Sequence, residues 1–416
     1  MKVLLLGGGG REHAIGWKLA QSPLLDELVS MPGNPGLAGL GPTVPTVDPT
    51  DLTAVTEYAV AKGVDFVVVG PEAPLAAGVV DALEVAGIAV FGPTRAAAQL
   101  EASKAFAKEI MMAAAVPTAG AAAFTDVAAA EDHLRGVQPP YVVKADGLAA
   151  GKGVLVTERL DAACSWVRRC IDGGFGTAGT TVVIEEHLAG REVSVFAICD
   201  GIHARPLAPA RDYKRLGDAD VGPNTGGMGC YSPVADLPDD LVAWTMRSVI
   251  APVLETMARR GTPFRGFLYA GLMLTDAGPK VLEFNCRLGD PETQVVLPRL
   301  EDDLLELLAA ASAGNLPDDP LSWRDEAAVD VVLASRGYPE APETGFPITG
   351  IAEAEKDALV FHAGTATHDG GLVTAGGRVL NVVGLGPTTG EARNVAYAAA
   401  ARIRFDGKTH RSDIGE

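Results

Sequence analysis

Long hydrophobic runs are absent from this sequence of 416 residues. No apolar stretch approaches the ~18–20 residues that a helix needs to cross a bilayer. The N-terminal apolar stretch is short and runs into glycines 7–10 and then Arg11, whereas a secretory signal has a longer apolar region and a cleavage site of small residues. We therefore expect a cytoplasmic protein with no membrane partner, whose first residues form a strand.

Cysteine is scarce, with five residues in the whole chain. A disulfide framework favours an even number, and a structural zinc site favours closely spaced pairs such as CxxC. The five cysteines fit neither pattern: they are Cys164, Cys170, Cys199, Cys230 and Cys286. We expect them to be reduced thiols that pack as small hydrophobic residues.

Positive charge is in deficit. Lysine and arginine number 34 against 53 aspartates and glutamates, which gives a net charge of −19. Such a surface repels a phosphate-rich polymer, so we expect no nucleic-acid partner. At physiological salt, charges are screened beyond ~8 Å, and a local cluster of Lys, Arg and backbone N–H groups can still bind a small phosphorylated ligand.

Hydrophobic residues, by contrast, make up 48% of the chain and charged residues 21%, a composition typical of folded globular proteins. The length exceeds what one hydrophobic core supports. Changes in the pattern of strands and helices predict an N-terminal domain at 1–101, a central domain at 102–325 and a C-terminal domain at 326–416.

The N-terminal domain has the pattern of a parallel α/β sheet. Apolar runs at 2–6, 65–69 and 88–91 each end in glycine, and helices are predicted at 13–21 and 78–86. Short apolar strands with helices between them indicate a parallel sheet. We predict an open, Rossmann-like unit whose ligand-binding loops lie at the carboxyl ends of the strands.

After residue 101 the pattern changes to α+β. A helix is predicted at 103–115, and most of the strands that follow are spaced as antiparallel hairpins. These strands lie at 141–144, 153–156, 181–185, 193–199, 267–274 and 280–284. The C-terminal domain is predicted to be small and rich in β-structure, with a strand at 329–334, a glycine-rich hairpin at 371–385 and a helix from about 390 to 403.

The glycines at 7–10 lie between a predicted strand and a predicted helix, where a dinucleotide fingerprint would lie. The GxGxxG pattern fails because Glu12 or His13 occupies the position of the third glycine, which disfavours a Rossmann oxidoreductase. The loop is then either a tight turn or an anion site, since free N–H groups at a helix start attract phosphate. We favour a site for a small phosphorylated substrate, with His13 in a structural or substrate-orienting role and not as a catalytic base.

A second glycine-rich loop spans 144–153. It fails as a P-loop because three residues separate Gly147 from Gly151 where the motif needs four, and Gly153 replaces the Ser or Thr that would bind magnesium. The flanking segments predict two antiparallel strands, whereas a P-loop enters a helix. A long hairpin turn and a lid that closes over phosphates both remain open, and the two lysines of the loop favour the lid.

The end of the strand at 280–284 carries a candidate metal site. Because side chains alternate along a strand, Glu283 and Asn285 share one face and Phe284 points into the core. A carboxylate and an amide oxygen are ligands suited to Mg²⁺, and two suffice when phosphates and water complete the octahedron. Arg287 follows, with a planar fork suited to a phosphoryl group. An ordinary strand end with exposed charges is the alternative.

Two further polar loops lie at 211–215 and 223–229, and each alone is typical of a solvated surface segment. Taken with the loops above, they resemble the ATP-grasp superfamily and, within it, the phosphoribosylamine–glycine ligase family, also called glycinamide ribonucleotide synthetases. Leu288 stands where many relatives are expected to have Phe, which is an apolar exchange. The matching segments run nearly end to end, at 9–14, 69–75, 103–106, 144–153, 223–229, 283–293 and 361–365.

The resemblance implies an ATP-grasp fold with a flexible lid subdomain at about 118–187. It also implies a carbon–nitrogen ligase of purine biosynthesis that uses ATP with Mg²⁺ or Mn²⁺. The glycine carboxylate would attack the γ-phosphate of ATP to give glycyl phosphate and ADP. The amine of 5-phosphoribosylamine would then attack the acyl carbon and release phosphate, which gives glycinamide ribonucleotide.

The resemblance also assigns roles to individual residues. Arg287 and Lys144 would be catalytic, and Glu283 and Asn285 would hold the metal, since the strand at 267–275 offers no further acid. ATP would be bound by Lys104, Lys144, Gly147, Gly151, Lys152, Gly153, Glu185, Glu186, Leu188 and Glu192. The substrates would be bound by Gly10, Arg11, Glu12, Glu72, Asp212, Lys214, Asn224 and Asp290.

Two other functions stay open at this point. An ATP-grasp enzyme with another acceptor, such as a carboxylase, would share the nucleotide residues and differ in its substrate. A nucleotide-binding sensor without turnover is disfavoured by the intact set Lys104, Lys144, Glu283, Asn285 and Arg287. The residues themselves indicate ATP and an anionic substrate, whereas glycine and phosphoribosylamine come from the resemblance. The expected assembly is a monomer.

Overall fold

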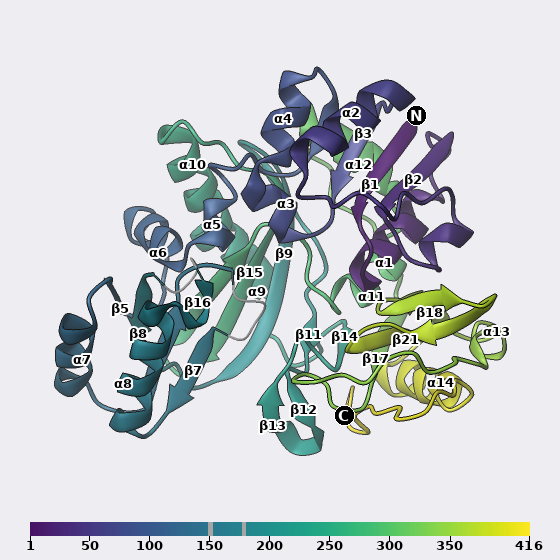
Figure 1. Cartoon of the computed structure of the whole chain (residues 1–416). Helices are drawn as coiled ribbons and strands as arrows, with labels where there is room; N and C mark the ends of the chain where they lie inside the picture. Colours follow the sequence, from purple (N-terminus) through teal and green to yellow (C-terminus); the bar gives the residue numbers. More distant parts are fainter. Residues whose placement is uncertain (149–152, 177–179) are drawn as a thin grey trace.

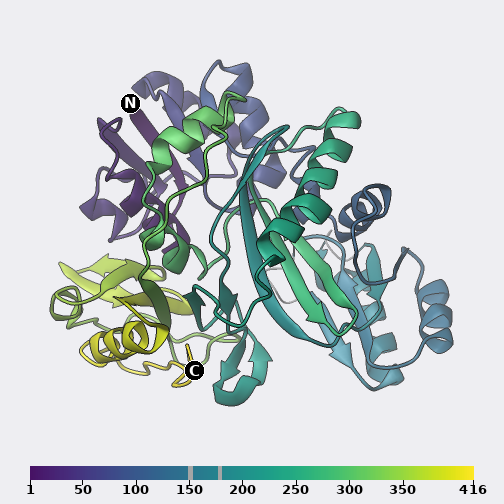
Figure 2. The same ribbon diagram turned by 180° about the vertical axis from the view of Figure 1, so that it is seen from behind.

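The computed structural model describes residues 1–148, 153–176 and 180–416 (Figure 1). Within these residues the strands form four larger sheets and two ribbons of two strands each. Figures 1 and 2 show the N-terminal and C-terminal parts of the chain on one side of the molecule, a long central sheet beside them, and a smaller lobe at the opposite edge. In the described residues, no helix is both long and apolar enough to cross a membrane.

The N-terminal sheet is parallel, with its strands in the order β2, β1, β3, β4. The strands are β1 (Lys2–Gly7), β2 (Glu27–Pro32), β3 (Phe66–Val69) and β4 (Ala89–Phe91). The side chains of β3 are all buried, as expected of a strand covered on both faces. The predicted open parallel α/β unit is confirmed, and β2 is a further strand that the apolar pattern did not reveal.

Helices and short turns connect these strands. They are α1 (Gly10–Leu19), η1 (Leu37–Gly39), α2 (Leu52–Lys62), α3 (Glu72–Ala77) and α4 (Val79–Val85). Helix α1 begins at Gly10 and not at His13 as predicted. The reason is a cap, because the Glu12 carboxylate accepts a hydrogen bond from the Gly9 N–H at 2.7 Å.

The central sheet is antiparallel, in the order β10, β9, β15, β16. Its strands are β9 (Arg191–Asp200), β10 (Ala204–Pro206), β15 (Arg265–Thr275) and β16 (Gly278–Asn285). Helices α6 and α10 pack against one face of it. The other face shares a hydrophobic cluster with the N-terminal sheet and α12, so the two sheets are joined through a common core. The helices flanking this sheet are α5 (Gln99–Ala102), α6 (Lys104–Ala113), α9 (Leu241–Thr245), η5 (Met246–Ile250), α10 (Ala251–Arg259) and α12 (Leu304–Ser312).

The lobe at the edge of the molecule contains an antiparallel sheet in the order β5, β8, β6, β7 (Figure 1). We call it the lid sheet because it falls within the predicted lid subdomain. It has a hydrophobic cluster of its own, which α7 and α8 complete. Its elements are β5 (Ala121–Phe124), α7 (Val127–Gly136), β6 (Tyr141–Ala145), β7 (Val154–Thr157), α8 (Leu160–Arg169), η2 (Cys170–Gly174) and β8 (Val182–Glu185). The pairing of β6 with β7 confirms that the glycine-rich loop joins two antiparallel strands.

The C-terminal sheet draws strands from two distant parts of the chain, in the order β11, β14, β17, β21, β18. Helix α14 (Thr389–Ala400) packs against it. The strands are β11 (Arg211–Asp212), β14 (Gly229–Ser232), β17 (Ala327–Ala334), β18 (Leu359–His362) and β21 (Arg378–Gly386). The first two precede β15 in sequence, so this sheet ties the C-terminal part of the chain to the loops beside the central sheet.

The predicted hairpin at 371–385 is wrong. Strand β20 (Gly371–Thr374) pairs with β19 (Thr365–His368). Strand β21 lies between β17 and β18 and is buried along most of its length. Because β21 has neighbours on both edges, it has no edge left to pair with β20. The remaining elements are β12 (Arg215–Gly217), η4 (Asp218–Asp220), β13 (Val221–Asn224), α11 (Thr293–Val296), η6 (Leu297–Arg299) and α13 (Ile351–Ala354).

Candidate active site

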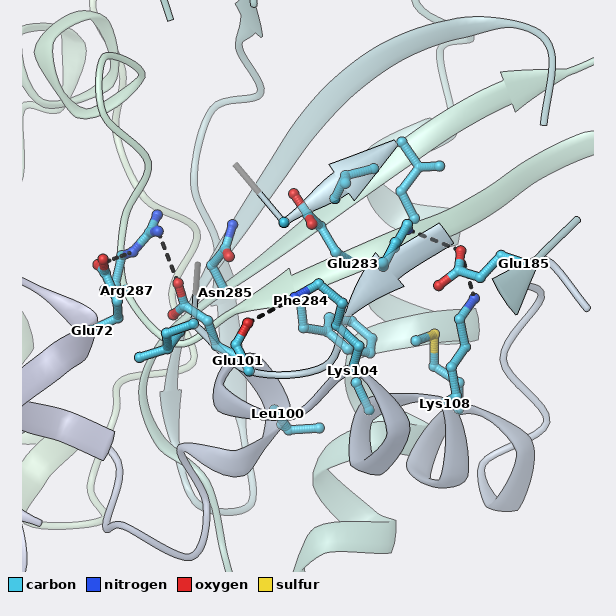
Figure 3. Close-up of a pocket in the computed structure, with 18 residues that line it drawn as sticks. Glu72, Leu100, Glu101, Lys104, Lys108, Glu185, Glu283, Phe284, Asn285 and Arg287 are labelled. Carbon is cyan, nitrogen blue, oxygen red and sulfur yellow. Dashed lines mark hydrogen bonds and ion pairs between the residues drawn. The ribbon is translucent and has the colours of Figure 1, made fainter. Parts of the chain in front are cut away.

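A cavity opens between the central sheet, helix α6 and the lid sheet (Figure 3). Its charged lining comes from six different elements or their ends. A second hollow, lined mainly by the lid sheet and the loops after β8 and β11, continues from it. Lys144, Glu185 and Glu283 border both. The cleft therefore gathers residues from well-separated parts of the sequence around one continuous space.

The predicted metal ligands lie at the end of β16. Glu283 and Asn285 line the cavity, while Phe284 between them is buried in the hydrophobic core. Burial acts to raise the pKa of Glu283, but cationic neighbours, foremost Lys214 and Lys144, bring it below its ordinary value. Glu283 is therefore an ionised carboxylate at neutral pH.

The residues fit a hard divalent cation of the Mg²⁺ type. The amide of Asn285 is satisfied when its nitrogen faces Glu101 and the Phe284 carbonyl, which leaves its oxygen free of them. Among the described residues, no group of three His, Cys, Asp or Glu side chains is arranged to hold a metal. One carboxylate and one amide oxygen therefore suit an ion whose other ligands are phosphate oxygens and water.

Three lysines lie along one wall of the cavity. Lys104 is the first residue of α6, and its Nζ lies 3.3 and 3.2 Å from the carbonyl oxygens of Asp146 and Gly147. Lys144 on β6 donates to Glu185 at 2.9 Å. Lys108, which the sequence analysis missed, lies 3.4 Å from the same carboxylate. Its spacing of four residues from Lys104 places both on one helix face and could have identified it.

The described ends of the glycine-rich loop border this wall. Gly147 and Gly153 line the cavity, and Asp146 at the loop start accepts hydrogen bonds from Ser103 Oγ and from the Ala105 N–H, at the first turn of α6. The loop and the helix that carries Lys104 are therefore tied together. The predicted nucleotide contacts Gly151 and Lys152 lie outside the described residues.

The second hollow holds the other predicted nucleotide contacts. Glu192 forms an ion pair with Lys214. Burial raises the pKa of Asp212 to about 7, and Lys214 acts in the opposite direction. Two predicted substrate contacts, Asp212 and Lys214, thus lie beside the predicted ribose contact. The predicted residues that line this hollow are Lys144, Glu185, Glu186, Leu188, Glu192, Asp212, Lys214, Asn224 and Glu283.

Arg287 lies at the end of the cavity away from Lys108 and Glu185, between two carboxylates (Figure 3). Its Nε is 3.1 Å from Glu72 Oε2, and its Nη2 is 2.8 Å from Glu101 Oε1. Arg11 Nη1 lies 3.8 Å from Glu72 Oε2. Burial favours a higher pKa for Glu72, but Arg287 and Arg11 bring it down to about 2. Glu72 thus contacts both Arg287, which is predicted to face the phosphoryl group, and Arg11, which follows the first strand of the N-terminal sheet.

The predicted substrate contacts Gly10 and Asp290 lie farther along the same side. A Cβ on Gly10 would meet the side-chain nitrogens of Asn381 and Gln294 at 2.3 and 2.9 Å, so this position has no room for a side chain. Asp290 accepts hydrogen bonds from Gln294 at 2.7 Å and from Arg378 at 2.8 Å. Arg378 and Asn381 belong to β21, and no local sequence signal pointed to them.

Glu12 and His13 have partners within the chain. The Glu12 carboxylate binds the Gly9 N–H at 2.7 Å and Arg11 Nε at 2.6 Å. His13 Nδ1 accepts a hydrogen bond from the His362 N–H at 2.8 Å. Burial lowers the pKa of His13 to about 3. His13 is therefore neutral and joins the N-terminal and C-terminal parts, while the role of Glu12 toward a substrate stays a prediction.

Comparisons with known proteins agree with this geometry. Family models of phosphoribosylglycinamide synthetase match the chain in three consecutive parts, the N domain at 1–101, the ATP-grasp (A) domain at 102–293 and the C domain at 328–416. Proteins named phosphoribosylamine–glycine ligase from Rhizobium meliloti and Streptomyces coelicolor are 51% and 52% identical over 415 and 419 residues. Both alignments cover 100% of this chain and 98% of the relative.

Solved structures give the same result. The crystal structure of phosphoribosylamine–glycine ligase from Thermotoga maritima superimposes with a TM-score of 0.87 at 38% identity, over 99% of this chain and 100% of that chain. A biotin carboxylase domain from Hydrogenobacter thermophilus has a TM-score of 0.72 at 16% identity, over 98% and 91%, and shares the fold. The fold is thus the predicted ATP-grasp fold, and the chain belongs to the phosphoribosylglycinamide synthetase family, whose members are named phosphoribosylamine–glycine ligases.

Proposed function

We propose that this protein ligates glycine to 5-phosphoribosylamine at the expense of ATP, giving glycinamide ribonucleotide, ADP and phosphate in purine biosynthesis. The observation that carries the proposal is the convergence of three cations, Lys104, Lys144 and Arg287, on the cavity that Glu283 and Asn285 line. Relatives named phosphoribosylamine–glycine ligase, which align over 98% of their own length, support the choice of substrates.

ATP occupies the continuous cleft between the central sheet and the lid sheet. Lys104 and Lys144 contact its phosphates from α6 and β6, and Gly147 and Gly153 lie beside them. The adenine lies in the second hollow against residues 185–188, and Glu192 binds the ribose. Glu283 and Asn285 would hold a Mg²⁺ or Mn²⁺ ion, which would neutralise negative charge on the phosphates of ATP.

The reaction proceeds in two steps. A glycine carboxylate oxygen attacks the γ-phosphorus, the bond to the bridging oxygen breaks, and ADP leaves glycyl phosphate behind. The amine of phosphoribosylamine then attacks the acyl carbon, loses a proton and expels phosphate. Arg287 and Lys144 stabilise the charge on the transferring phosphoryl group, because fixed cations in a partly dry cleft need no reorganisation during the reaction.

Phosphoribosylamine lies on the other side of Arg287, against the loops at the carboxyl ends of the N-terminal strands. Gly10 and Arg11 from the first loop and Glu72 from the loop after β3 surround this place, and Asp290 closes it from the central part. Parallel α/β sheets bind ligands at this end of their strands. The alternation of charges from Arg11 through Glu72 to Arg287 brings the amine acceptor close to the phosphoryl site.

The proposed setting is the cytoplasm, with the protein acting as a monomer on small molecules. The five cysteines are all free and buried, which suits a reducing compartment. Size-exclusion chromatography with light scattering would establish the assembly: a mass near 42.9 kDa supports the monomer, and a multiple of it contradicts the proposal.

ADP release tests the proposed function. The purified protein is given ATP and Mg²⁺, with glycine and freshly prepared phosphoribosylamine each present or omitted, and alanine in place of glycine as a control. We expect rapid release only when both substrates are present, and none with alanine. Rapid release without phosphoribosylamine, or with a different carboxylate in place of glycine, would overturn the substrate assignment and leave the ATP-grasp fold unaffected.

A further inference from the structure

The proposed function needs two side chains at the end of β16, Asn285 and Arg287. Asn285 is the last residue of the strand, and Cys286 separates it from Arg287. Each has more than one possible orientation: the Asn285 amide can present oxygen or nitrogen to the cavity, and the Arg287 fork can turn about its long stem. A third residue, Glu101 at the end of the short helix α5, lies against both of them (Figure 3). Only 6% of its side chain is exposed.

Glu101 contacts three consecutive residues through two hydrogen bonds and one ion pair, with the Asn285 amide in its satisfied orientation. Its Oε2 binds the Cys286 backbone N–H at 2.7 Å. Its Oε1 lies 2.8 Å from Arg287 Nη2, and 3.1 Å from the Asn285 amide nitrogen in the orientation that satisfies both ends of that amide. One carboxylate thus fixes the backbone at 286 and the side chains on either side of it.

The chemistry of the carboxylate decides which way Asn285 points. Both oxygens of Glu101 already face groups that can only donate, the Cys286 N–H and the Arg287 guanidinium, so the amide must direct its NH₂ group toward Glu101. The amide oxygen then points away from Glu101 and is available to a cation. If the amide were reversed, two oxygens would face each other near 3.1 Å, and the NH₂ group would be presented to the metal.

The same carboxylate limits the rotation of Arg287. Its Nη2 is held by Glu101, and its Nε is held by Glu72 on the opposite side. The guanidinium is therefore held from two helices, α5 and α3, at two different nitrogens. Charge-assisted contacts of this kind are stronger than neutral hydrogen bonds and more demanding in direction.

We infer that Glu101 is a positioning residue that turns the oxygen of Asn285 toward the metal and holds the fork of Arg287 toward the phosphoryl group. The inference rests on the proposed function for the role of the metal and the phosphoryl group. One buried acid would thus orient both a metal ligand, Asn285, and a catalytic cation, Arg287. In this role Glu101 acts through Asn285 and Arg287.

Glu101→Gln is the informative change, because it keeps the size of the side chain and replaces one acceptor oxygen by a donor NH₂ group. The Asn285 amide then loses its acceptor, or it turns round and directs its oxygen toward the new NH₂ group and away from the metal. We expect the Mn²⁺ affinity of the protein in the presence of ADP, measured by electron paramagnetic resonance without turnover, to fall at least tenfold. The turnover number should fall as well.

Two matched variants separate this effect from a general loss of charge. Glu109→Gln removes an acid of α6 that is paired with exposed Arg260 at 2.9 Å, and it should leave Mn²⁺ affinity and turnover as in the wild type. Glu72→Gln removes the other partner of Arg287, which has no contact with Asn285 among those described. It should lower turnover and leave Mn²⁺ affinity within about twofold, which is about 0.4 kcal/mol.

The double variant E101Q/N285D offers a rescue. The glutamine NH₂ group can donate to one oxygen of the new aspartate, the other oxygen can face the metal, and the total charge is that of the wild type. We expect its Mn²⁺ affinity to return to within about fivefold of the wild type, where RT ln 5 is below 1 kcal/mol. A purely structural role for Glu101 would give no such rescue, and the double variant decides the matter even where E101Q alone does not fold.

Wild-type Mn²⁺ affinity in E101Q, or no recovery in the double variant, would overturn the inference. Absence of Mn²⁺ binding to the wild type with ADP would overturn it too, because no metal would then be held at Asn285. Loss in E101Q with recovery in E101Q/N285D supports the inference even if ADP release proves independent of glycine. In that case the positioning role stands and the substrate assignment of the proposed function fails.

Discussion

Two nitrogens of Arg287 each contact a carboxylate, Glu72 and Glu101. A side chain with the same charge but without the planar guanidinium therefore cannot substitute for it. We expect Arg287→Lys to lower turnover at saturating substrates at least tenfold, about 1.4 kcal/mol in the barrier. A lysine has a single nitrogen and cannot reach Glu72, Glu101 and the phosphoryl group together. The steady-state rate checks this, with exposed Arg260→Lys as the control. A rate near that of the wild type would remove Arg287 from the mechanism.

His13 predicts how stability responds to pH. Its pKa is about 3 in the folded protein because it is buried, against about 6.5 when unfolded. Below pH 6.5 the unfolded chain takes up a proton that the folded chain does not, so stability falls as the pH falls toward 3. From pH 6.5 to 5 the loss is about 1.6 kcal/mol.

The comparison of wild type with His13→Asn checks this pH dependence. Asparagine keeps an acceptor for the His362 N–H, bonded at 2.8 Å in the wild type, but does not titrate. Urea unfolding at pH 7 and at pH 5 should show a smaller loss of stability for the variant than for the wild type. Equal losses would mean that His13 is protonated in the folded protein.

At the scale of single residues, the sequence predicted what local geometry determines. Alternation along a strand placed Glu283 and Asn285 on the cavity with Phe284 in the core. Glu101 was not found, because the backbone group it binds is 185 residues away. Arg378 was missed for the same reason, since its partner Asp290 is 88 residues away in the sequence.

At the scale of elements, the first turn of α6 depends on the glycine-rich loop. Asp146 accepts the Ala105 N–H at 2.7 Å, beside the cap that Ser103 provides. We expect Asp146→Ala to reduce stability by about 1 kcal/mol, typical of a lost helix cap. We also expect a KM for ATP raised at least threefold, because Lys104 at the helix start loses its support.

A matched helix cap provides the control for Asp146. Asp126 caps α7 through the Ala129 N–H at 2.9 Å, on the lid sheet and outside the cavity lining. Asp126→Ala should cost a similar amount of stability, about 1 kcal/mol, with an unchanged KM for ATP. Thermal unfolding and steady-state kinetics measure both effects. Equal changes of KM in the two variants would show that the loop does not support Lys104.

The elements also show where pattern analysis ends. The parallel N-terminal strands and the antiparallel pairs β6–β7 and β15–β16 follow from short apolar runs and the turns between them. The predicted hairpin at 371–385 failed because β21 pairs with β17 and β18 on its two edges. Strand pairing at long range is decided by the packing of the whole sheet, which alternation of side chains does not encode.

At the scale of the whole molecule, Arg378 joins three segments. It donates to the carbonyl oxygens of Gly226 and Asp290, both at 2.6 Å, and to the Asp290 carboxylate at 2.8 Å. We expect Arg378→Ala to raise the KM for phosphoribosylamine at least fivefold and the KM for ATP less, because Asp290 lies on the substrate side. Steady-state kinetics with each substrate varied would show the difference.

Arg402 on the same C-terminal part is the control for Arg378. It pairs with exposed Asp357 at the surface, so Arg402→Ala should leave both KM values unchanged. An equal rise of both KM values in Arg378→Ala would show that this arginine holds the fold in general and has no particular link to the substrate side.

The C-terminal sheet imposes an order on the making of the protein. Strands β11 and β14 are synthesised well before β17 and β21, yet they pair in one sheet with them. Until β17 has been synthesised, the edge of β14 that pairs with it stays unpaired, although the central sheet can already form. An unpaired strand edge can pair with other chains and promote aggregation. Asp212 on β11 therefore belongs to a sheet that is complete only after β17, β18 and β21 have been synthesised.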